Sequence, residues 1–170
     1  MQLAPRVNLS GESGTLAAGL PGMRQTLATM RRLVTEARQD VRIRQTALHV
    51  VFPVAARNTA GEIAALLRYV QNEIRYTPDV LEVETLAHPV TTLQTRAGDC
   101  DDFSTLLASL CETVGIPTRF VCVAYQYPGM FEHVYLQAFD GVQWWNLDAT
   151  QKGPIGYAPP NAVSIFIEGN

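Results

Sequence analysis

A single thiol, that of Cys100, stands where a helix is predicted to begin, a position suited to nucleophilic chemistry. The helix is predicted over residues 100–114, because apolar residues recur there at helical spacing and a Gly-Ile-Pro stop signal follows at 115–117. The unpaired N–H groups and positive dipole end of a helix start favour thiolate over thiol. Three flanking acidic residues can cap the helix, but their charge opposes thiolate formation: Asp99, Asp101 and Asp102. The local sequence allows either a nucleophile or a small packed residue.

A histidine and an aspartate are predicted to face each other across a β-hairpin further along the chain. Asp140-Gly141 is a strong two-residue turn signal between two strand-like runs. With that turn, residues whose numbers add to 281 face each other, which places His133 opposite Asp148. Together with Cys100, these residues supply, in chain order, a nucleophile, a base and a carboxylate that orients the base.

Three blocks of sequence around these residues resemble a known family: RAGDCDDFSTLLASLCETVGIPTRFV, EHVYLQ and WWNLDAT. They are similar to the transglutaminase-like cysteine enzyme superfamily, whose core has a Gly-x-Cys helix start, a Gly-Ile-Pro-x-Arg helix exit, a histidine strand and an Asp-x-Thr strand end. The resemblance covers about residues 63–150. It implies an α+β fold with a papain-like arrangement, in which N-terminal helices and the cysteine-bearing helix pack on an antiparallel β-sheet. It also implies Cys100 as nucleophile, His133 as general base and acid, and Asp148 as the orienting residue.

Gln94 is a candidate for binding the oxyanion, since it lies six residues before Cys100. That spacing resembles papain-type enzymes, in which a glutamine side chain has this role. The backbone N–H of Cys100 would be the second donor. A plain surface glutamine is the alternative. Arg96 is a second candidate in this stretch, because it could orient the acidic cluster and relieve its opposition to the thiolate.

The implied function is acyl transfer that cleaves a peptide or other amide bond through a thioester. Attack by water would make the protein a peptidase or amidase, and attack by an amine would make it a transglutaminase. The small size of the chain favours hydrolysis. The expected partner is a protein, peptide or other amide substrate, and no cofactor or metal is expected. A different class stays open, namely a non-catalytic interaction or structural protein that retains the fold, such as a phage virion component. A metal site formed by the cysteines and a histidine is disfavoured by their spacing.

The predicted organisation has three parts: a flexible tail at 1–21, an amphipathic helix and connection at 22–58, and a catalytic core at 59–170. The amphipathic helix is predicted from an apolar stripe and is expected to end before His49: Met23, Leu27, Met30, Val34, Ala37 and Val41. The stripe could pack on its own domain, or it could serve self-association or docking to a virion partner.

Inside the core, a second helix is predicted from Thr59, which forms a capping-box signature with Glu62. A connecting stretch follows, with Pro78 and Pro89 as breakers. The hairpin strands are predicted to turn a mainly apolar face to the core: Val134, Leu136, Ala138, Trp145 and Leu147. A short final strand is expected over residues 163–167.

Composition bears on the number of domains, on nucleic-acid binding, on the state of the cysteines and on location. A chain of 170 residues with 47% hydrophobic content fits one domain with a substantial core, and a net charge of −3 gives no case for nucleic acid. Three cysteines at these spacings indicate reduced thiols, with Cys111 and Cys122 as small core residues. No apolar run is long enough to span a membrane, and the first residues lack the pattern of a signal peptide. A cytoplasmic location is expected, with the virion as the alternative.

Overall fold

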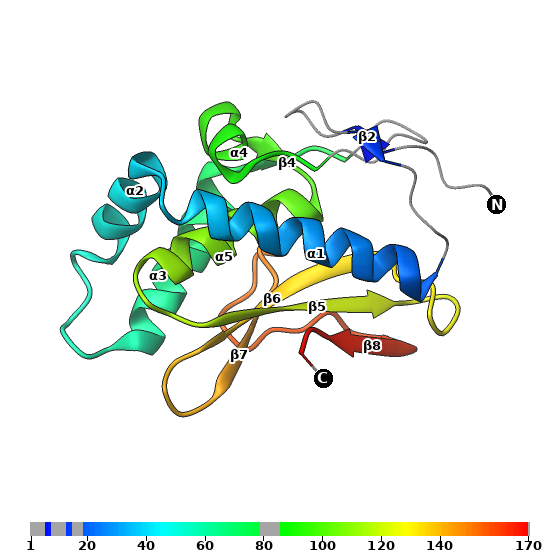
Figure 1. The fold of residues 1–170 in the computed structure, drawn as a ribbon. Coiled ribbons are helices and arrows are strands. Elements are labelled where there is room, and N and C mark those ends of the chain that lie inside the picture. Colours follow the sequence, from blue (N-terminus) through cyan, green and yellow to red (C-terminus); the bar gives the residue numbers. More distant parts are fainter. Residues whose placement is uncertain (1–5, 8–12, 15–18, 79–85, 170) are drawn as a thin grey trace.

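The computed structural model describes residues 6–7, 13–14, 19–78 and 86–169 and shows helices packed over one face of an antiparallel sheet (Figure 1). The helices are α1 Leu20–Ala37, α2 Val41–Val51, α3 Thr59–Glu73, α4 Pro89–Thr95 and α5 Cys100–Thr113. The sheet has the strand order β7-β6-β5-β8, with β5 Thr118–Ala124, β6 His133–Phe139, β7 Trp144–Leu147 and β8 Ser164–Ile167. Two short pairs join β1 Arg6–Val7 to β2 Ser13–Gly14 and β3 Arg75–Tyr76 to β4 Ala97–Gly98. The predicted α+β class is confirmed.

Helix α5 is the centre of the molecule, and its predicted position is confirmed. Every residue from Asp102 to Cys111 is buried, because β6 lies on one side of the helix and the other four helices lie around it. The buried hydroxyls of Ser104, Thr105 and Ser109 each donate to a backbone carbonyl oxygen, so they are satisfied inside the core. The helix ends before Gly115, whose φ of 85° is the left-handed conformation that glycine tolerates best.

The N-terminal region forms two helices where one was expected. The break follows α1, and Asp40 then caps α2 by accepting a hydrogen bond from the Arg42 N–H at 2.8 Å. The expected end before His49 is wrong, because α2 continues through it. Leu27, Met30, Val34 and Ala37 of the predicted stripe are buried in the chain's own core, whereas Met23 is half-buried and Val41 is exposed at the start of α2. Most of the predicted tail lies outside the described residues, although Leu20 and Pro21 belong to α1.

Helix α3 forms where it was predicted, but its cap is one residue earlier. The side chain of Asn58 accepts a hydrogen bond from the Gly61 N–H at 3.0 Å, so Thr59 is the first helical residue. Helix α4 was missed. Its first residue is Pro89, which suits that position because proline has no N–H to leave unpaired, and the His88 side chain accepts from the Val90 N–H at 3.3 Å. The part of the predicted connection at 79–85 lies outside the described residues.

The predicted register of the β6–β7 hairpin is wrong by two residues. Gln137 pairs with Asn146 and Phe139 with Trp144, so facing residue numbers add to 283. The turn is longer than Asp-Gly alone, because the Asp140 carboxylate accepts from the N–H groups of the second and third residues after it, at 2.7 and 2.8 Å. A shift of two leaves each side chain on its face of the sheet. The predicted core face is therefore correct, with four of its members buried and Trp145 half-buried against them.

The opposite face of the sheet is covered in part, and Ile165 of β8 stays exposed on it. Val121, Val123 and Tyr135 are buried there, and the half-buried Ala162 and Ile167 pack against them. Strand β8 falls within the predicted final strand. Cys111 and Cys122 are buried, as predicted. Within the described ranges, none of the helices is both long enough and apolar enough to span a membrane.

Candidate active site

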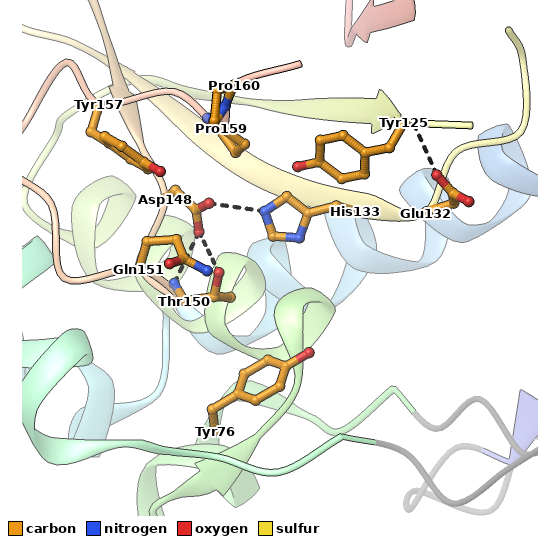
Figure 2. A pocket seen from close by; sticks show the side chains of 10 residues that line it. All are labelled: Tyr76, Tyr125, Glu132, His133, Asp148, Thr150, Gln151, Tyr157, Pro159 and Pro160. Atoms are coloured by element: carbon orange, nitrogen blue, oxygen red, sulfur yellow. Dashed lines mark hydrogen bonds and ion pairs between the residues drawn. The ribbon is translucent and has the colours of Figure 1, made fainter. Parts of the chain in front are cut away.

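A pocket of about 600 Å³ opens where the sheet, the segment after β7 and the short strand β3 come together (Figure 2). Six of its residues lie in the proline-containing segment after β7, and one, Tyr76, comes from β3 on the opposite wall. Ten residues line it: Tyr76, Tyr125, Glu132, His133, Asp148, Thr150, Gln151, Tyr157, Pro159 and Pro160.

His133 and Asp148 form the polar centre of this pocket. Nε2 of His133 lies 3.0 Å from Oδ2 of Asp148 (Figure 2). The other carboxylate oxygen accepts hydrogen bonds from the N–H and Oγ1 of Thr150, at 3.0 and 2.7 Å. Burial of Asp148 alone would raise its pKa, but the hydrogen bonds from His133 and Thr150 outweigh burial and hold the pKa below its usual value. The carboxylate therefore stays ionised and fixes the ring of the histidine.

The contact between His133 and Asp148 arises differently from the predicted one. Strand β7 ends at Leu147, which pairs with Leu136, so continuing the register places Asp148 opposite Tyr135 and diagonal to His133. Diagonal neighbours on one face of a sheet are within reach of long side chains. Both register positions put the two side chains on the same face, and for that reason the predicted contact exists although the predicted register does not.

Cys100 is the first residue of α5, and two contacts bring it to β6. The Ser104 hydroxyl, one turn further along α5, donates to the carbonyl oxygen of Val134 at 3.2 Å. The backbone N–H of Val134 donates to the Cys100 sulfur. Val134 directly follows His133, so the thiol lies next to the strand that carries the histidine.

The start of α5 is held tightly in place. Asp99 caps the helix by accepting from the N–H groups of Asp101 and Asp102, at 3.1 and 3.2 Å. Asp102 is itself buried and accepts from the Ala87 N–H at 2.8 Å. A Cβ at Gly98 would lie 2.6 Å from the Cβ of Asp102, so the close approach of β4 to α5 requires glycine there.

The electrostatic surroundings of Cys100 favour the neutral thiol. Burial raises its pKa well above the usual value, and the charges of Asp101 and Asp99 raise it further. The Sγ atom lies 3.7 Å from Oδ1 of Asp101. The Val134 N–H acts in the opposite direction but does not compensate. Burial and the carboxylates therefore keep Cys100 protonated, although it is the first residue of the helix.

The other two candidates from this stretch lie elsewhere. Gln94 is exposed on α4 and does not belong to the lining of the pocket. Arg96 forms an ion pair with Glu73, with Nη1 3.0 Å from Oε2, and both side chains are exposed. Neither residue is placed against the pocket.

Sequence reasoning missed the walls of the pocket. Tyr125 directly follows strand β5, and its ring and that of Tyr135 each stack on His133, with centroid distances of 6.4 Å. The strand-like run at residues 118–125 was the one signal in the sequence for Tyr125. Tyr76 and the loop residues had none, because their approach depends on tertiary structure. Across the part of the chain that the structure describes, no three His, Cys, Asp or Glu residues are grouped so that they could hold a metal ion.

The fold and this site define an α+β protein in which a cysteine-bearing helix packs on an antiparallel sheet that carries a His–Asp pair. The family model for the transglutaminase-like superfamily matches residues 28–149, so the chain belongs to that superfamily. No curated protein matches the sequence.

Solved structures share the fold. A protein described as a candidate protease from Parabacteroides distasonis superposes with a TM-score of 0.61 at 16% identity, over 76% of this chain and 26% of that one. A candidate cysteine protease from Cytophaga hutchinsonii gives 0.54 at 21% identity, over 87% and 57%. LapG from Legionella pneumophila gives 0.53 at 15% identity, over 78% and 80%. The chain thus spans 26% and 57% of the first two proteins, and at these identities the likeness concerns the fold.

Proposed function

We propose that this protein is a cysteine-dependent peptidase or amidase, with Cys100 as nucleophile, His133 as general base and acid, and Asp148 as the residue that orients the histidine. The observation that carries the proposal is the hydrogen bond between Nε2 of His133 and Asp148 at 3.0 Å, on the strand whose next residue contacts the Cys100 sulfur. If Nε2 donates its proton to the carboxylate, Nδ1 is the nitrogen that can accept a proton from the thiol.

The proposed reaction begins when Nδ1 of His133 takes the proton of Cys100 as the sulfur bonds to the amide carbon of the substrate. The backbone N–H of Cys100 would donate to the oxyanion that forms. The C–N bond then breaks, the leaving nitrogen takes the proton from His133, and a thioester remains on Cys100. Water attacks this thioester, gives its proton to His133, and releases a carboxylic acid and the free thiol.

The raised pKa of Cys100 determines the order of these events in the proposal. A thiol surrounded by carboxylates does not lose its proton in advance, so the proton is transferred during the attack on the substrate. Hydrolysis is favoured over amine transfer because two proteins that share the fold are described as candidate proteases. The two reactions differ only in whether water or an amine attacks the thioester.

The test is the pH dependence of iodoacetamide modification at each cysteine, measured by peptide mass spectrometry in the original protein and in His133→Ala. The proposal predicts modification of Cys100 that weakens in the variant, while the buried Cys111 stays unmodified as an internal control. Peptide and amide substrates are then supplied with and without a primary amine. Mass spectrometry distinguishes the hydrolysed product from the amine adduct.

A second candidate is a non-catalytic interaction protein that retains the fold, for example a phage virion component. The observation in its favour is that the thiol is largely buried and does not line the pocket. Cys100 modification that is slow at all pH values and insensitive to His133→Ala, with no amide turned over, would support this candidate and contradict the peptidase.

A further inference from the structure

We propose that Glu132 and the tyrosines of the pocket form a subsite for the side chain of a lysine or arginine in the peptide substrate. This inference rests on the proposed function, because it names the substrate class of the same site. It starts from the charges around the pocket. Of the ten described residues that line it, none is Lys or Arg, and two are carboxylates, Glu132 and Asp148.

The two carboxylates differ in their hydrogen-bond and ion-pair partners. The side chain of Asp148 is 1% exposed, and both of its oxygens accept hydrogen bonds from His133 and Thr150. The negative charge of Asp148 is therefore stabilised by residues of the protein itself. Glu132 is exposed and directly precedes His133, and among the described residues no Lys, Arg or His lies within 4.0 Å of its carboxylate. Glu132 is therefore the carboxylate of the pocket that is available to a ligand.

The backbone of β5 holds Glu132 in this place. Its N–H donates to the carbonyl oxygen of Val123 at 2.9 Å, and its Oε2 accepts from the N–H of Tyr125 at 2.9 Å (Figure 2). One carboxylate oxygen is thus fixed, while the other can accept hydrogen bonds from a cation. The preorganised side chain loses little further freedom when a ligand binds.

Aromatic rings complete the subsite. Tyr125 follows β5 and its backbone is bonded to Glu132, while Tyr157 and Tyr76 belong to other walls of the pocket (Figure 2). Tyrosine faces attract ammonium and guanidinium groups, and the methylene stem of a lysine or arginine packs well along such rings. An acidic side chain would meet two carboxylates and no lining Lys or Arg. The pocket therefore selects against acidic residues next to the scissile bond.

Calorimetric titration of a Cys100→Ser protein, in which turnover is suppressed, tests this subsite. The probes are capped Ala/Gly hexapeptides with one Lys at each position in turn, and matched peptides with norleucine or Glu in place of Lys. Norleucine supplies the apolar stem without the ammonium group. At the best position we expect Lys to bind about tenfold more tightly than norleucine, Glu to bind most weakly, and the preference for Lys to weaken with added salt.

The matched variants are Glu132→Gln and Glu62→Gln, both in the Cys100→Ser protein. The amide side chain in Glu132→Gln would keep an oxygen that accepts the Tyr125 N–H, so the variant removes the charge and retains the contact. Glu62 lies in the first turn of α3 and does not line the pocket, so its variant makes the same change of net charge elsewhere. We expect the preference for Lys to fall below about twofold in Glu132→Gln and to persist in Glu62→Gln.

Three results would overturn the subsite: norleucine binding as tightly as Lys, an unchanged preference in Glu132→Gln, or no measurable binding of any peptide. Its failure is distinguishable from failure of the proposed function. Modification of Cys100 that depends on His133, together with cleavage of neutral and basic peptides at equal rates, would leave the peptidase intact and remove the subsite. Glu132-dependent binding of Lys peptides by a protein whose Cys100 thiol is unreactive would support the subsite and contradict the peptidase.

Discussion

Asp101 is the residue whose charge acts most directly on the proposed nucleophile. Its Oδ1 lies 3.7 Å from the Cys100 sulfur, and its charge adds to the effect of burial in raising the pKa of the thiol. We expect Asp101→Asn to lower that pKa, so that Cys100 reacts with iodoacetamide several-fold faster at pH 7 than in the original protein. A fall of one pKa unit would increase the thiolate fraction about tenfold. Equal or slower modification would show that the carboxylate does not control the thiol.

Asp148 gives a second prediction about a single residue, with a defined dependence on pH. Its pKa in the fold lies below the usual value of 3.8, so its ionised form stabilises the folded state above about pH 4. That contribution is lost as the pH falls through the folded pKa. Asp148→Asn should lower the free energy of unfolding by about 1–3 kcal/mol at pH 7, because hydrogen bonds to a buried charge are weakened.

The check for Asp148→Asn is urea unfolding at pH 7, 5 and 3. The difference between the two proteins should be nearly constant at the two higher values and smaller at pH 3. A difference that stays the same at pH 3 would mean that the aspartate does not titrate as the structure implies. The same variant should reduce amide cleavage by about a thousandfold or more if the histidine depends on this carboxylate for its orientation.

Among the elements, α1 is tied to the sheet and to α5 by one side chain. The guanidinium of Arg31 forms ion pairs with Glu112 of α5 and Glu168 directly after β8, and lies over the ring of Phe120 with its carbon 4.8 Å from the centroid. It also donates to the carbonyl oxygen of Thr118 at 3.3 Å. A single residue thus connects α1 with α5, β5 and the residue that follows β8.

We expect Arg31→Ala to lower the free energy of unfolding by about 2–3 kcal/mol, because two half-buried carboxylates lose this partner and Glu112 keeps only the more exposed Arg38, at 3.5 Å. Arg44→Ala is the control, since it removes the same charge from an exposed position on α2 and should cost under about 0.5 kcal/mol. Urea unfolding measures both. Equal effects would mean that the contacts of Arg31 add nothing beyond its charge.

The elements also show where sequence reasoning succeeded. Helix α5 was predictable because its apolar spacing, its aspartate cap and its Gly-Ile-Pro exit all agree. Helix α4 was missed because seven residues are too few for a period to be visible, and a proline that begins a helix resembles one that breaks it. The hairpin turn was mistaken because Asp-Gly suits a two-residue turn equally well, and only the Asp140 carboxylate shows which turn forms.

At the scale of the whole molecule, the pocket depends on how separate segments are brought together. The candidate roles of Cys100, His133 and Asp148 could be predicted, because they follow from the types of these residues and from the strand face that His133 and Asp148 share. The walls could not, because Tyr76 and the loop that contains Tyr157 approach each other only through the fold. For the same reason Gln94 was a reasonable candidate by spacing, although the structure places it outside the lining.

One side chain anchors that loop to the helical layer. Nε2 of Gln71, on α3, donates to the carbonyl oxygens of Gln151 and Gly153, at 2.6 and 2.9 Å. We expect Gln71→Ala to loosen the loop, because two carbonyl groups lose their donor. Limited proteolysis between residues 151 and 163 should become several-fold faster. Modification of Cys100 should be unchanged, and equal proteolysis rates would show that the anchor is dispensable.

The positions of the two tryptophans allow intrinsic fluorescence to report on the pocket. Both lie in β7, but a Cβ at Gly156 would be 3.5 Å from the ring of Trp145, so this indole packs against the loop that walls the pocket. Trp144 packs instead against Phe139 and under the guanidinium of Arg119. A ligand that shifts the loop would change the emission of one indole more than that of the other. With Trp144→Phe, the fluorescence of an otherwise unlabelled protein would follow occupancy of the pocket directly.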